Sequence, residues 1–582
     1  MKKRLYNMYG LIHTLKYPAT LFASIQAMFD ERVYENKEHL KTAGEWLLYM
    51  QNEDGGYSRK FSFITGRDRS YIETTGYIIP SMIRLGEYLG ERKFIHSGLK
   101  AGEFLLRVQN EDGSFSDIDT RQPFVFDTGQ CLTGLNFLYE YSNDTRYLNA
   151  LQKAAYWLKE VQEKDGSWER FSYNRQTHTY YSRVAAAMLK SAYLLKDKEL
   201  EQAALQHVAF VLRQQQPNGF FAKSSFIEGI APYLHTLMYV LEGLLDIYDM
   251  MPQEEILQAV LKNAERFAHI NLHRDLILCS QYDSEFRCVN HERCITGLAQ
   301  WAGVALRLYA LTNDERFLKS AVNTLFYVKA KQIKSSSMRG GFSASIPFWG
   351  RYGSFDFVNW NNKFFIDALL AYETYDISMY REQESFVGAA FNRVDVVTDE
   401  MSFMDKEYLK RLRKVLPKNQ KIKVLDVGCG KGVIIKRLQE EFPLIEFIGV
   451  DPVFEDAVVQ KGSVYELSFA DESIDYVLLF EVLQHTYMEK ALQEVYRVLK
   501  PGGKVMIGER NKISILGVLK PFFELSGTWM YPYDAPFREK WYSKRAWKEM
   551  LKRSGFEMKR IETIEGAGKP YVNRYVFIEG EK

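Results

Sequence analysis

The first two thirds of the chain repeats one pattern of apolar and polar positions. Four segments each carry an aromatic residue, apolar positions three and four residues apart, a glutamine, and then an Asp-Gly or Asn-Gly pair. The glycines of these pairs are Gly55, Gly113, Gly166 and Gly219. Apolar positions at that spacing form one face of a helix, and glycine accepts the left-handed conformation that stops a helix. The pattern therefore predicts a repeated helix–turn unit.

A second helix is expected after each turn. These helices are rich in small and apolar residues around much of their circumference, which is typical of buried helices. They begin near Ile72, Asp127, Tyr181, Pro232, Arg293 and Trp360. More amphipathic helices are predicted over residues 38–50, 94–108, 146–161, 200–213, 254–267 and 316–328. Six inner and six outer helices make an (α/α)6 toroid, although the fifth and sixth repeats lack the turn pattern.

The loops that lead into the inner helices carry aromatic, acidic and basic residues together. In such a toroid we expect the ligand site where the inner helices begin. Mixed aromatics and charges suit a sugar, whose rings stack and whose hydroxyls accept and donate hydrogen bonds. The alternative for any one residue is an aromatic of the core or a charged helix cap. The candidate ligand contacts are Asp127, Tyr180, Arg183, Trp349, Tyr352 and Trp360.

The last third of the chain alternates strands and helices. An apolar strand ends at Val427 and leads into Gly428, Gly430 and Gly432 before an apolar helix. Glycines after a strand let the backbone bend tightly and approach a ligand closely. Asp451 ends the next strand, where an acid can bind both hydroxyls of a ribose. By itself this loop would also fit an NAD or ATP site.

Composition narrows the class of protein. The 582 residues are 46% hydrophobic and 26% charged, as in folded globular proteins, and the net charge of +2 argues against a nucleic-acid partner. Aromatic residues make up 14% of the chain, enough to fill a large core and line a pocket. We find no signal peptide and no apolar run long enough for a transmembrane segment. Peripheral membrane contact and the oligomeric state stay open.

The five cysteines are an odd number without a disulfide-like framework, which favours a reducing cytoplasm. Four potential zinc ligands, Cys279, Cys288, His291 and Cys294, lie within 16 residues. Three thiols and an imidazole could form a tetrahedral site. Because no Cys-x-x-Cys pair is present and buried thiols are common, we expect no metal.

The C-terminal third resembles class I S-adenosylmethionine-dependent methyltransferases over about residues 405–582. The resemblance rests on the glycine-rich loop and on the segments 447–451, 467–486, 492–509, 541–563 and 571–580 in order. It implies S-adenosylmethionine as the cofactor and gives roles by position. Asp426, Gly428, Gly430 and Gly432 would hold the methionine end, Asp451 the ribose, Ser463 and Val464 the adenine, and Glu481 would lie beside the sulfonium.

Two features of this region stay open. Only 11 residues separate Asp451 from Ser463, too few for the usual second helix plus third strand, so we expect a shortened adenine wall. His485 follows the fourth strand and is the candidate base for a hydroxyl acceptor, or else it caps the next helix. Residues 511–540 interrupt the last strands with several aromatics and are expected to form an acceptor lid or an interdomain contact.

The repeat resembles the (α/α)6-toroid superfamily of terpene cyclases, glycoside hydrolases, sugar epimerases and polysaccharide lyases. Over about residues 35–375 it looks most like uncharacterised toroid proteins encoded with bacterial surface-polysaccharide genes. By analogy with uronate epimerases and lyases, Tyr181, His235 and Glu73 would move a proton and Arg183 would pair with a uronate. Residues 116–120 differ from the Asp-x-Asp-Asp acid of class II terpene cyclases, because Thr120 replaces the last acid.

The sequence therefore predicts a multidomain cytoplasmic enzyme. A toroid spans residues 1–375, a linker 376–404, and a Rossmann-like α/β methyltransferase domain 405–582. We expect O-methylation of a carbohydrate or glycolipid intermediate of surface polysaccharide synthesis, with a toroid that binds or processes the glycan. The alternatives are a non-catalytic glycan platform, or a terpenoid cyclase whose product is methylated.

Overall fold

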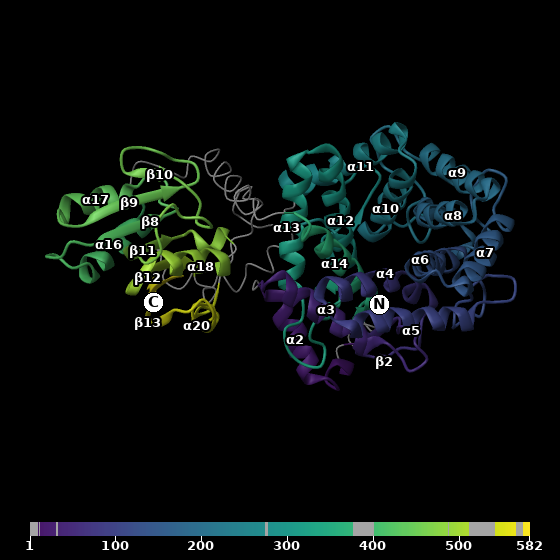
Figure 1. Ribbon diagram of the computed structural model, residues 1–582, viewed down its shortest axis with the longest axis horizontal. Helices are drawn as coiled ribbons and strands as arrows, with labels where there is room; N and C mark the ends of the chain where they lie inside the picture. The colour runs from purple at the N-terminus through teal and green to yellow at the C-terminus, as the bar shows by residue number, and fades with distance from the viewer. Residues whose placement is uncertain are drawn as a thin grey trace. The chain divides into compact units, whose positions relative to one another are not determined.

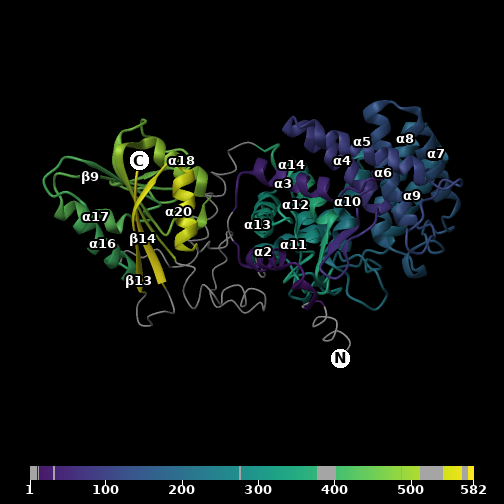
Figure 2. The same ribbon diagram turned by 90° about the horizontal axis from the view of Figure 1, so that it is seen from below.

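The computed structural model describes residues 10, 12–30, 33–273, 277–375, 401–486, 488–510, 542–565 and 574–582. The chain divides into two compact units, Met1–Thr374 and Tyr375–Lys582. Most of the linker predicted over 376–404, and the lid or interdomain contact predicted over 511–540, lie outside the described residues. Figures 1 and 2 show the N-terminal unit as a ring of helices and the C-terminal unit as a sheet with helices on both sides.

The inner ring of the N-terminal unit is built as the repeat predicts. Its helices begin within two residues of the expected positions. They are α4 (Ile72–Leu89), α6 (Val125–Ser142), α8 (Ser182–Leu195), α10 (Leu234–Met250), α12 (Ile295–Thr312) and α14 (Asn359–Tyr372). Each packs on the next, and α14 packs on α4. The ring closes at six inner helices within the described residues.

The outer helices alternate with the inner ones along the chain. They are α3 (Asn36–Met50), α5 (Arg92–Val108), α7 (Thr145–Glu160), α9 (Lys198–Arg213), α11 (Glu254–His273) and α13 (Glu315–Lys331). A further helix, α2 (Pro18–Phe29), packs on α13. The loops hold the 3-10 turns η1 (Tyr173–Arg175) and η2 (Thr179–Tyr181), and the short strands β1 (Lys60–Ser62), β2 (Gly66–Arg67), β3 (Gln281–Tyr282), β4 (Cys288–Asn290), β5 (Arg293–Cys294), β6 (Ser345–Ile346) and β7 (Asp356–Val358).

In five of the repeats a glutamine ties neighbouring outer helices together. The Gln51 side-chain amide donates to the carbonyl oxygens of Gly55, at 2.8 Å, and of Ser97 on the next outer helix, at 2.9 Å. The same two bonds recur at Gln109, Gln162 and Gln215. Gln332 repeats them with Gly340 and His39, both at 3.1 Å, and so joins the sixth repeat to the first.

The repeat glycines have a different role from the one expected. Helix α3 ends at Met50, and its cap residue is extended, so Gly55 lies in the following turn rather than at the helix stop. Its φ of 97° is left-handed, and an added Cβ would lie 2.7 Å from the Lys100 carbonyl oxygen. Glycine is required because the turn lies directly against the next outer helix.

The C-terminal unit is a seven-stranded mixed sheet in the order β10-β9-β8-β11-β12-β14-β13. The strands are β8 (Lys423–Val427), β9 (Glu446–Asp451), β10 (Val459–Lys461), β11 (Ile474–Phe480), β12 (Leu499–Arg510), β13 (Glu557–Glu565) and β14 (Arg574–Glu581). Strands β8 to β12 are parallel, whereas β14 pairs antiparallel with both β12 and β13. The order reverses beside β8, which is where doubly wound sheets bind their ligands.

Helices cover both faces of this sheet. Residues of α16 (Phe403–Val415) and α17 (Val433–Glu441) form one buried cluster with the sheet, and residues of α18 (Met488–Val498) and α20 (Lys544–Arg553) form the other. Between Asp451 and Ser463 the described chain forms the short strand β10 but no helix. The third strand is therefore kept and the second helix is missing, in agreement with the short spacing.

The cysteines depart from the expectation. A disulfide joins Cys279 to Cys288, whereas Cys131, Cys294 and Cys429 are free thiols. The expected lack of disulfides is therefore wrong for this pair. Among the described residues, no helix has the length and apolar character needed to cross a bilayer.

Candidate functional site

The glycine-rich loop joins β8 to α17 at the carboxyl edge of the sheet. Gly428, Gly430 and Gly432 all have left-handed φ angles, of 72°, 55° and 68°. An added Cβ at Gly428 would lie 2.4 Å from Cγ2 of Val482, which follows the neighbouring strand β11. The sequence thus folds into a loop that only glycines permit, and the loop packs against the end of β11.

Asp451 holds this loop to the end of β9. One carboxylate oxygen accepts a hydrogen bond from the Gly430 backbone N–H at 2.8 Å. The other accepts from the N–H groups of Val453 and Phe454 at 2.9 and 3.1 Å. The oxygen that accepts from Gly430 keeps a further lone pair, so the carboxylate can still accept a hydrogen bond from a hydroxyl of a diol.

Asp426 is a buried carboxylate with 3% of its surface exposed. Burial raises its pKa well above the ordinary value, and the nearby charges of Asp405 and Asp451 raise it further. Within the described part of the chain no group donates a hydrogen bond to its carboxylate. Burying a carboxylate that accepts no hydrogen bond costs free energy, unless a ligand supplies the hydrogen-bond donor. A cationic ammonium group would be such a donor.

The segment after β11 is held in an uncommon conformation. Glu481 is half-buried and has a left-handed φ of 58°, and its N–H donates to the Gly508 carbonyl oxygen at 2.7 Å. The next residues turn into η3 (Leu483–His485), where the buried Glu509 carboxylate accepts from the Leu483 N–H at 2.7 Å. His485 is 7% exposed within this turn. Glu509 anchors the turn and was not predicted.

The residues expected near the adenine lie after β10. Val464 is fully buried in the core cluster, and the Ser463 hydroxyl accepts from the Tyr465 N–H at 3.1 Å. Sequence reasoning also missed Tyr408 of α16. Its ring stacks on Phe480 with centroids 4.4 Å apart, over the carboxyl end of β11. Burial raises the Tyr408 pKa well above its ordinary value.

The mouth of the toroid holds two carboxylates that destabilise each other's charge. Burial raises the pKa of Glu73 to about 7. Burial and the charge of Glu73 raise the pKa of Asp127. Asp127 accepts a hydrogen bond from the Tyr173 hydroxyl, which lies 3.4 Å from the Tyr71 hydroxyl. Tyr173 was not predicted, because the turn η1 brings it beside α6 from a distant part of the chain.

A buried polar chain crosses the ring below this mouth. Nδ1 of His235 lies 2.6 Å from the Gln300 side-chain oxygen, so Nδ1 carries the proton. The Gln300 amide donates to Glu242 at 2.9 Å, and Glu242 pairs with Arg183 at 2.7 Å. Burial, with a smaller contribution from the Arg183 charge, lowers the pKa of His235 to about 3. The ring is therefore neutral near pH 7 and keeps Nε2 as an acceptor.

Several buried polar atoms around this chain have no hydrogen-bond partner among the described residues. They are Asp127 Oδ2, Gln130 Nε2 and the hydroxyls of Tyr77, Tyr180 and Tyr239. They come from the inner helices α4, α6 and α10 and from η2. Buried polar groups are normally paired, so an unpaired group points to a ligand or water. Five such atoms inside one ring mark a polar site.

The other residues expected to contact a ligand do not all lie in the same cluster. Tyr180, Tyr181, Tyr352 and His235 belong to one buried aromatic cluster. The Trp360 indole N–H donates to the Tyr352 hydroxyl at 2.7 Å. The Tyr181 hydroxyl accepts from the Tyr173 N–H at 3.2 Å, and burial raises its pKa. Trp349 is 39% exposed and contacts Phe348 rather than this cluster.

A cavity of about 480 Å³ lies on the far side of the polar chain. All six inner helices line it, with Arg183 in the first turn of α8 and residues such as Glu242, Gln300 and Arg307 beyond the first turn of their helices. Most of its charged groups are ion-paired, as at Arg307 with Asp246 and Asp249, both at 2.7 Å. We expected the ligand space where the inner helices begin. This cavity lies instead towards their carboxyl ends.

Comparison with known proteins identifies the C-terminal unit. The family model described as methyltransferase domain matches residues 401–560. An uncharacterised protein of Methanocaldococcus jannaschii is 32% identical over 178 residues, which are 28% of this chain and 78% of that protein. The C-terminal unit belongs to the methyltransferase domain family. This unit is therefore an enzyme domain, and its cofactor is S-adenosylmethionine.

Other relatives of the methyltransferase domain are longer than the matched region. The mitochondrial ubiquinone biosynthesis O-methyltransferase of Mus musculus is 29% identical over 164 residues, which are 25% of this chain and 43% of the relative. The chain thus spans less than half the length of that relative. The Asp426 carboxylate and the Asp451 acceptor together fit the ammonium and hydroxyl groups of S-adenosylmethionine, and the three loop glycines let the backbone come close to it.

The N-terminal unit is a toroid similar to the cyclases. The family model described as squalene-hopene cyclase C-terminal domain matches residues 16–251. An unsaturated glucuronyl hydrolase specific for heparin is 15% identical, with 58% of this chain and 97% of that chain covered and a TM-score of 0.48. At that level the likeness says nothing about the reaction.

The acids nearest to the cyclase pattern serve local structure. Asp117 accepts hydrogen bonds from the N–H groups of Asp119 and Thr120, at 3.1 and 2.8 Å. Asp119 pairs with Arg59 at 3.2 Å and with Arg69 at 2.9 Å. Both acids are therefore engaged in hydrogen bonds or ion pairs with neighbouring loop residues.

Proposed function

We propose that this chain transfers a methyl group from S-adenosylmethionine to an oxygen of a carbohydrate or glycolipid intermediate of surface polysaccharide synthesis. The toroid binds the same glycan and processes it. The cytoplasm is the proposed compartment. The observation that carries the proposal is the pairing of a methyltransferase domain with a toroid whose interior holds five unpartnered buried polar atoms.

The chain's own residues would bind and orient the cofactor, which supplies an electrophilic methyl group when bound. Asp426 would accept from the ammonium group, and Gly428, Gly430 and Gly432 would let the backbone approach the methionine end closely. Asp451 would accept from the ribose hydroxyls, while Ser463 and Val464 would border the adenine. These roles rest on the loop geometry and on the lack of a donor to Asp426 among the described residues.

Methyl transfer requires the acceptor oxygen in line with the sulfur–methyl bond, so positioning supplies much of the rate. A sugar hydroxyl also has to lose its proton. His485 is the proposed base, and Glu481 is proposed to lie beside the sulfonium. Both follow β11 next to the glycine loop, because Val482 contacts Gly428. His485→Ala should lower the turnover number at least tenfold without a comparable change in cofactor affinity.

In the toroid the proposed catalytic groups are Tyr181, His235 and Glu73. A carboxyl group whose pKa is about 7 can donate or accept a proton near neutral pH. The neutral His235 ring offers Nε2 as an acceptor. Arg183 is already paired with Glu242, so a uronate carboxylate would have to share it. Asp127, Tyr180, Tyr352 and Trp360 would supply sugar contacts, and Trp349 an outer one.

A second candidate is a terpenoid or polyprenyl substrate. The match of residues 16–251 to the squalene-hopene cyclase model favours it. The names of several relatives, such as demethylmenaquinone methyltransferase of Listeria monocytogenes, also concern quinones. Against cyclisation, Asp119 is held by Arg59 and Arg69. A toroid that only binds glycan is the third candidate.

Radiolabelled methyl transfer separates these candidates. The full chain would be incubated with methyl-labelled S-adenosylmethionine and either polysaccharide precursors or polyprenyl lipids. The proposal expects label in a saccharide, with none for Asp426→Ala. Label in the polyprenyl lipid alone would overturn it. Glu73→Gln then tests the toroid: altered saccharide structure with intact binding indicates processing, whereas an unaltered product indicates a platform.

A further inference from the structure

A short hairpin in the toroid brings two cysteines and a histidine together, outside the sites described above. Strands β3 and β4 pair antiparallel just before α12. Cys279 precedes β3 and Cys288 begins β4, so the pairing places their sulfur atoms side by side, and a disulfide joins them. His291 follows β4 directly.

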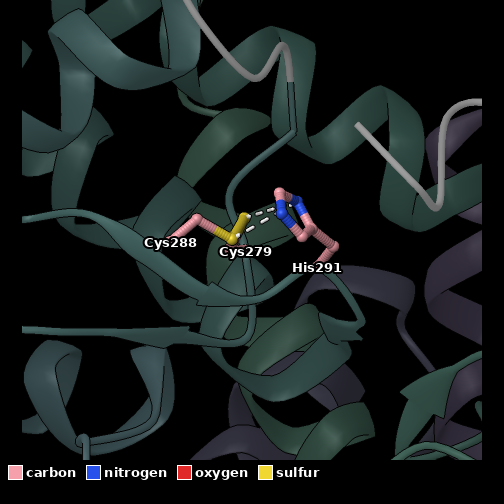
Figure 3. Close-up of side chains that lie close together, drawn as sticks. All are labelled: Cys279, Cys288 and His291. Atoms are coloured by element: carbon pink, nitrogen blue, oxygen red, sulfur yellow. Dashed lines mark hydrogen bonds between the residues drawn. A yellow bond between two sulfur atoms is a disulfide. The ribbon is translucent and has the colours of Figure 1, made fainter. Parts of the chain in front are cut away.

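The imidazole of His291 points at both sulfur atoms (Figure 3). Its Nδ1 lies 3.8 Å from Sγ of Cys279 and 3.5 Å from Sγ of Cys288. In a tetrahedral zinc site, Zn–S bonds of about 2.3 Å and Zn–N bonds of about 2.1 Å place sulfur and nitrogen about 3.6 Å apart. The nitrogen therefore already stands where a zinc ligand would stand. Only the two sulfurs would have to separate, to about 3.8 Å.

The surroundings leave room for an ion to enter. Cys279 is buried, Cys288 is half-buried, and His291 is exposed, so the site opens to solvent on the histidine side. Arg293 donates a hydrogen bond to Cys279 Sγ at 3.7 Å, and its positive charge favours the thiolate once the disulfide is reduced. Cys294, the fourth residue of the sequence cluster, is not part of this group.

We propose that Cys279, Cys288 and His291 form a zinc site in the reduced protein, with a solvent molecule in the fourth position. The disulfide is the oxidised, metal-free state of the same site. When zinc binds to the reduced site, two thiols release two protons and become thiolate ligands. When one thiolate attacks a small disulfide such as oxidised glutathione, a mixed disulfide forms and one small thiolate leaves. The second cysteine thiolate then attacks the cysteine sulfur of the mixed disulfide and displaces the other small thiolate. Two protons are then taken up, the Cys279–Cys288 bond forms, and two small thiols and Zn²⁺ leave.

Zinc binding by the full chain tests the proposal. The protein would be reduced with a phosphine, desalted and titrated with Zn²⁺ against a chromogenic chelator. We expect one zinc per chain, loss of binding after treatment with oxidised glutathione, and recovery on reduction. Differential alkylation with mass spectrometry should find Cys279 and Cys288 blocked only in the oxidised sample. Failure of the reduced chain to bind zinc would overturn the proposal.

Variants assign the ligands. Cys288→Ser should weaken zinc binding at least 100-fold, and His291→Ala at least tenfold. The matched controls are Cys429→Ser and His96→Ala, which change the same residue types away from the hairpin and should leave zinc affinity unchanged. Because His291 is exposed, its variant should fold even if Cys288→Ser does not. Wild-type affinity in either ligand variant would overturn the three-ligand site.

Discussion

Glu73→Gln should make the toroid more stable at pH 8 but barely so at pH 5. In the folded chain, burial raises the Glu73 pKa from 4.5 to about 7. Between these two values the folded state keeps a proton that the unfolded state has released. The folded state therefore binds more protons, and stability falls as the pH rises through this window. Glutamine is neutral throughout and avoids the loss.

The size of the effect follows from the shift. A rise of about 2.5 pKa units corresponds to about 3 kcal/mol of lost stability above pH 7, and to less than about 1 kcal/mol at pH 5. For a unit that ends at Thr374, the average unfolding entropy is about 0.8 kcal/mol/K. The variant should therefore melt about 4 °C higher than the wild type at pH 8, and about 1 °C higher at pH 5.

Scanning calorimetry of the full chain at both pH values measures this difference. The control is Glu53→Gln, the same chemical change at an exposed position of the first repeat turn. The control should follow the wild type at both pH values. An equal shift at pH 5 and pH 8, or a lower melting temperature for Glu73→Gln at pH 8, would refute a buried carboxyl group with a raised pKa.

Three further variants test the two units. Asp426→Asn removes the charge that would meet the cofactor's ammonium group and should weaken S-adenosylmethionine binding at least tenfold; unchanged affinity by calorimetry would count against that role. Gly428→Ala places a Cβ 2.4 Å from Val482 at a left-handed φ, so cofactor binding should be lost, and wild-type affinity would show that the loop adapts. Glu242→Ala leaves Arg183 as an uncompensated buried cation and should cost about 3–5 kcal/mol in denaturant unfolding, whereas a loss below about 1 kcal/mol would mean that water replaces the partner.

The helices of the toroid could be predicted because each repeats a local pattern. Their apolar spacing set the helix starts to within two residues. The closure of the ring at the sixth repeat could not be predicted from the turn pattern. The hydrogen bond between the glutamine and the glycine joins residues four apart at Gln51 and Gly55, but residues eight apart at Gln332 and Gly340. The contact is the same in space, but its sequence spacing differs.

The same difference between local and distant residues decides how much of each site could be predicted. The cofactor loop could be predicted because strand, glycines and Asp451 follow one another in a fixed order. The toroid interior could be predicted only in part, since the bonds of Glu242 with Arg183 and Gln300 join different inner helices. The disulfide was missed for a similar reason: it depends on the pairing of two very short strands, β3 and β4, which carry no strong sequence pattern.

Cofactor binding tests the central claim most directly. Isothermal titration of the full chain with S-adenosylmethionine should give one site per chain, and S-adenosylhomocysteine should compete for it. The Asp426→Asn variant, run at the same concentrations, should bind at least tenfold more weakly. If the wild-type chain gives no binding heat and no competition up to millimolar cofactor, it does not act as a methyltransferase through this loop.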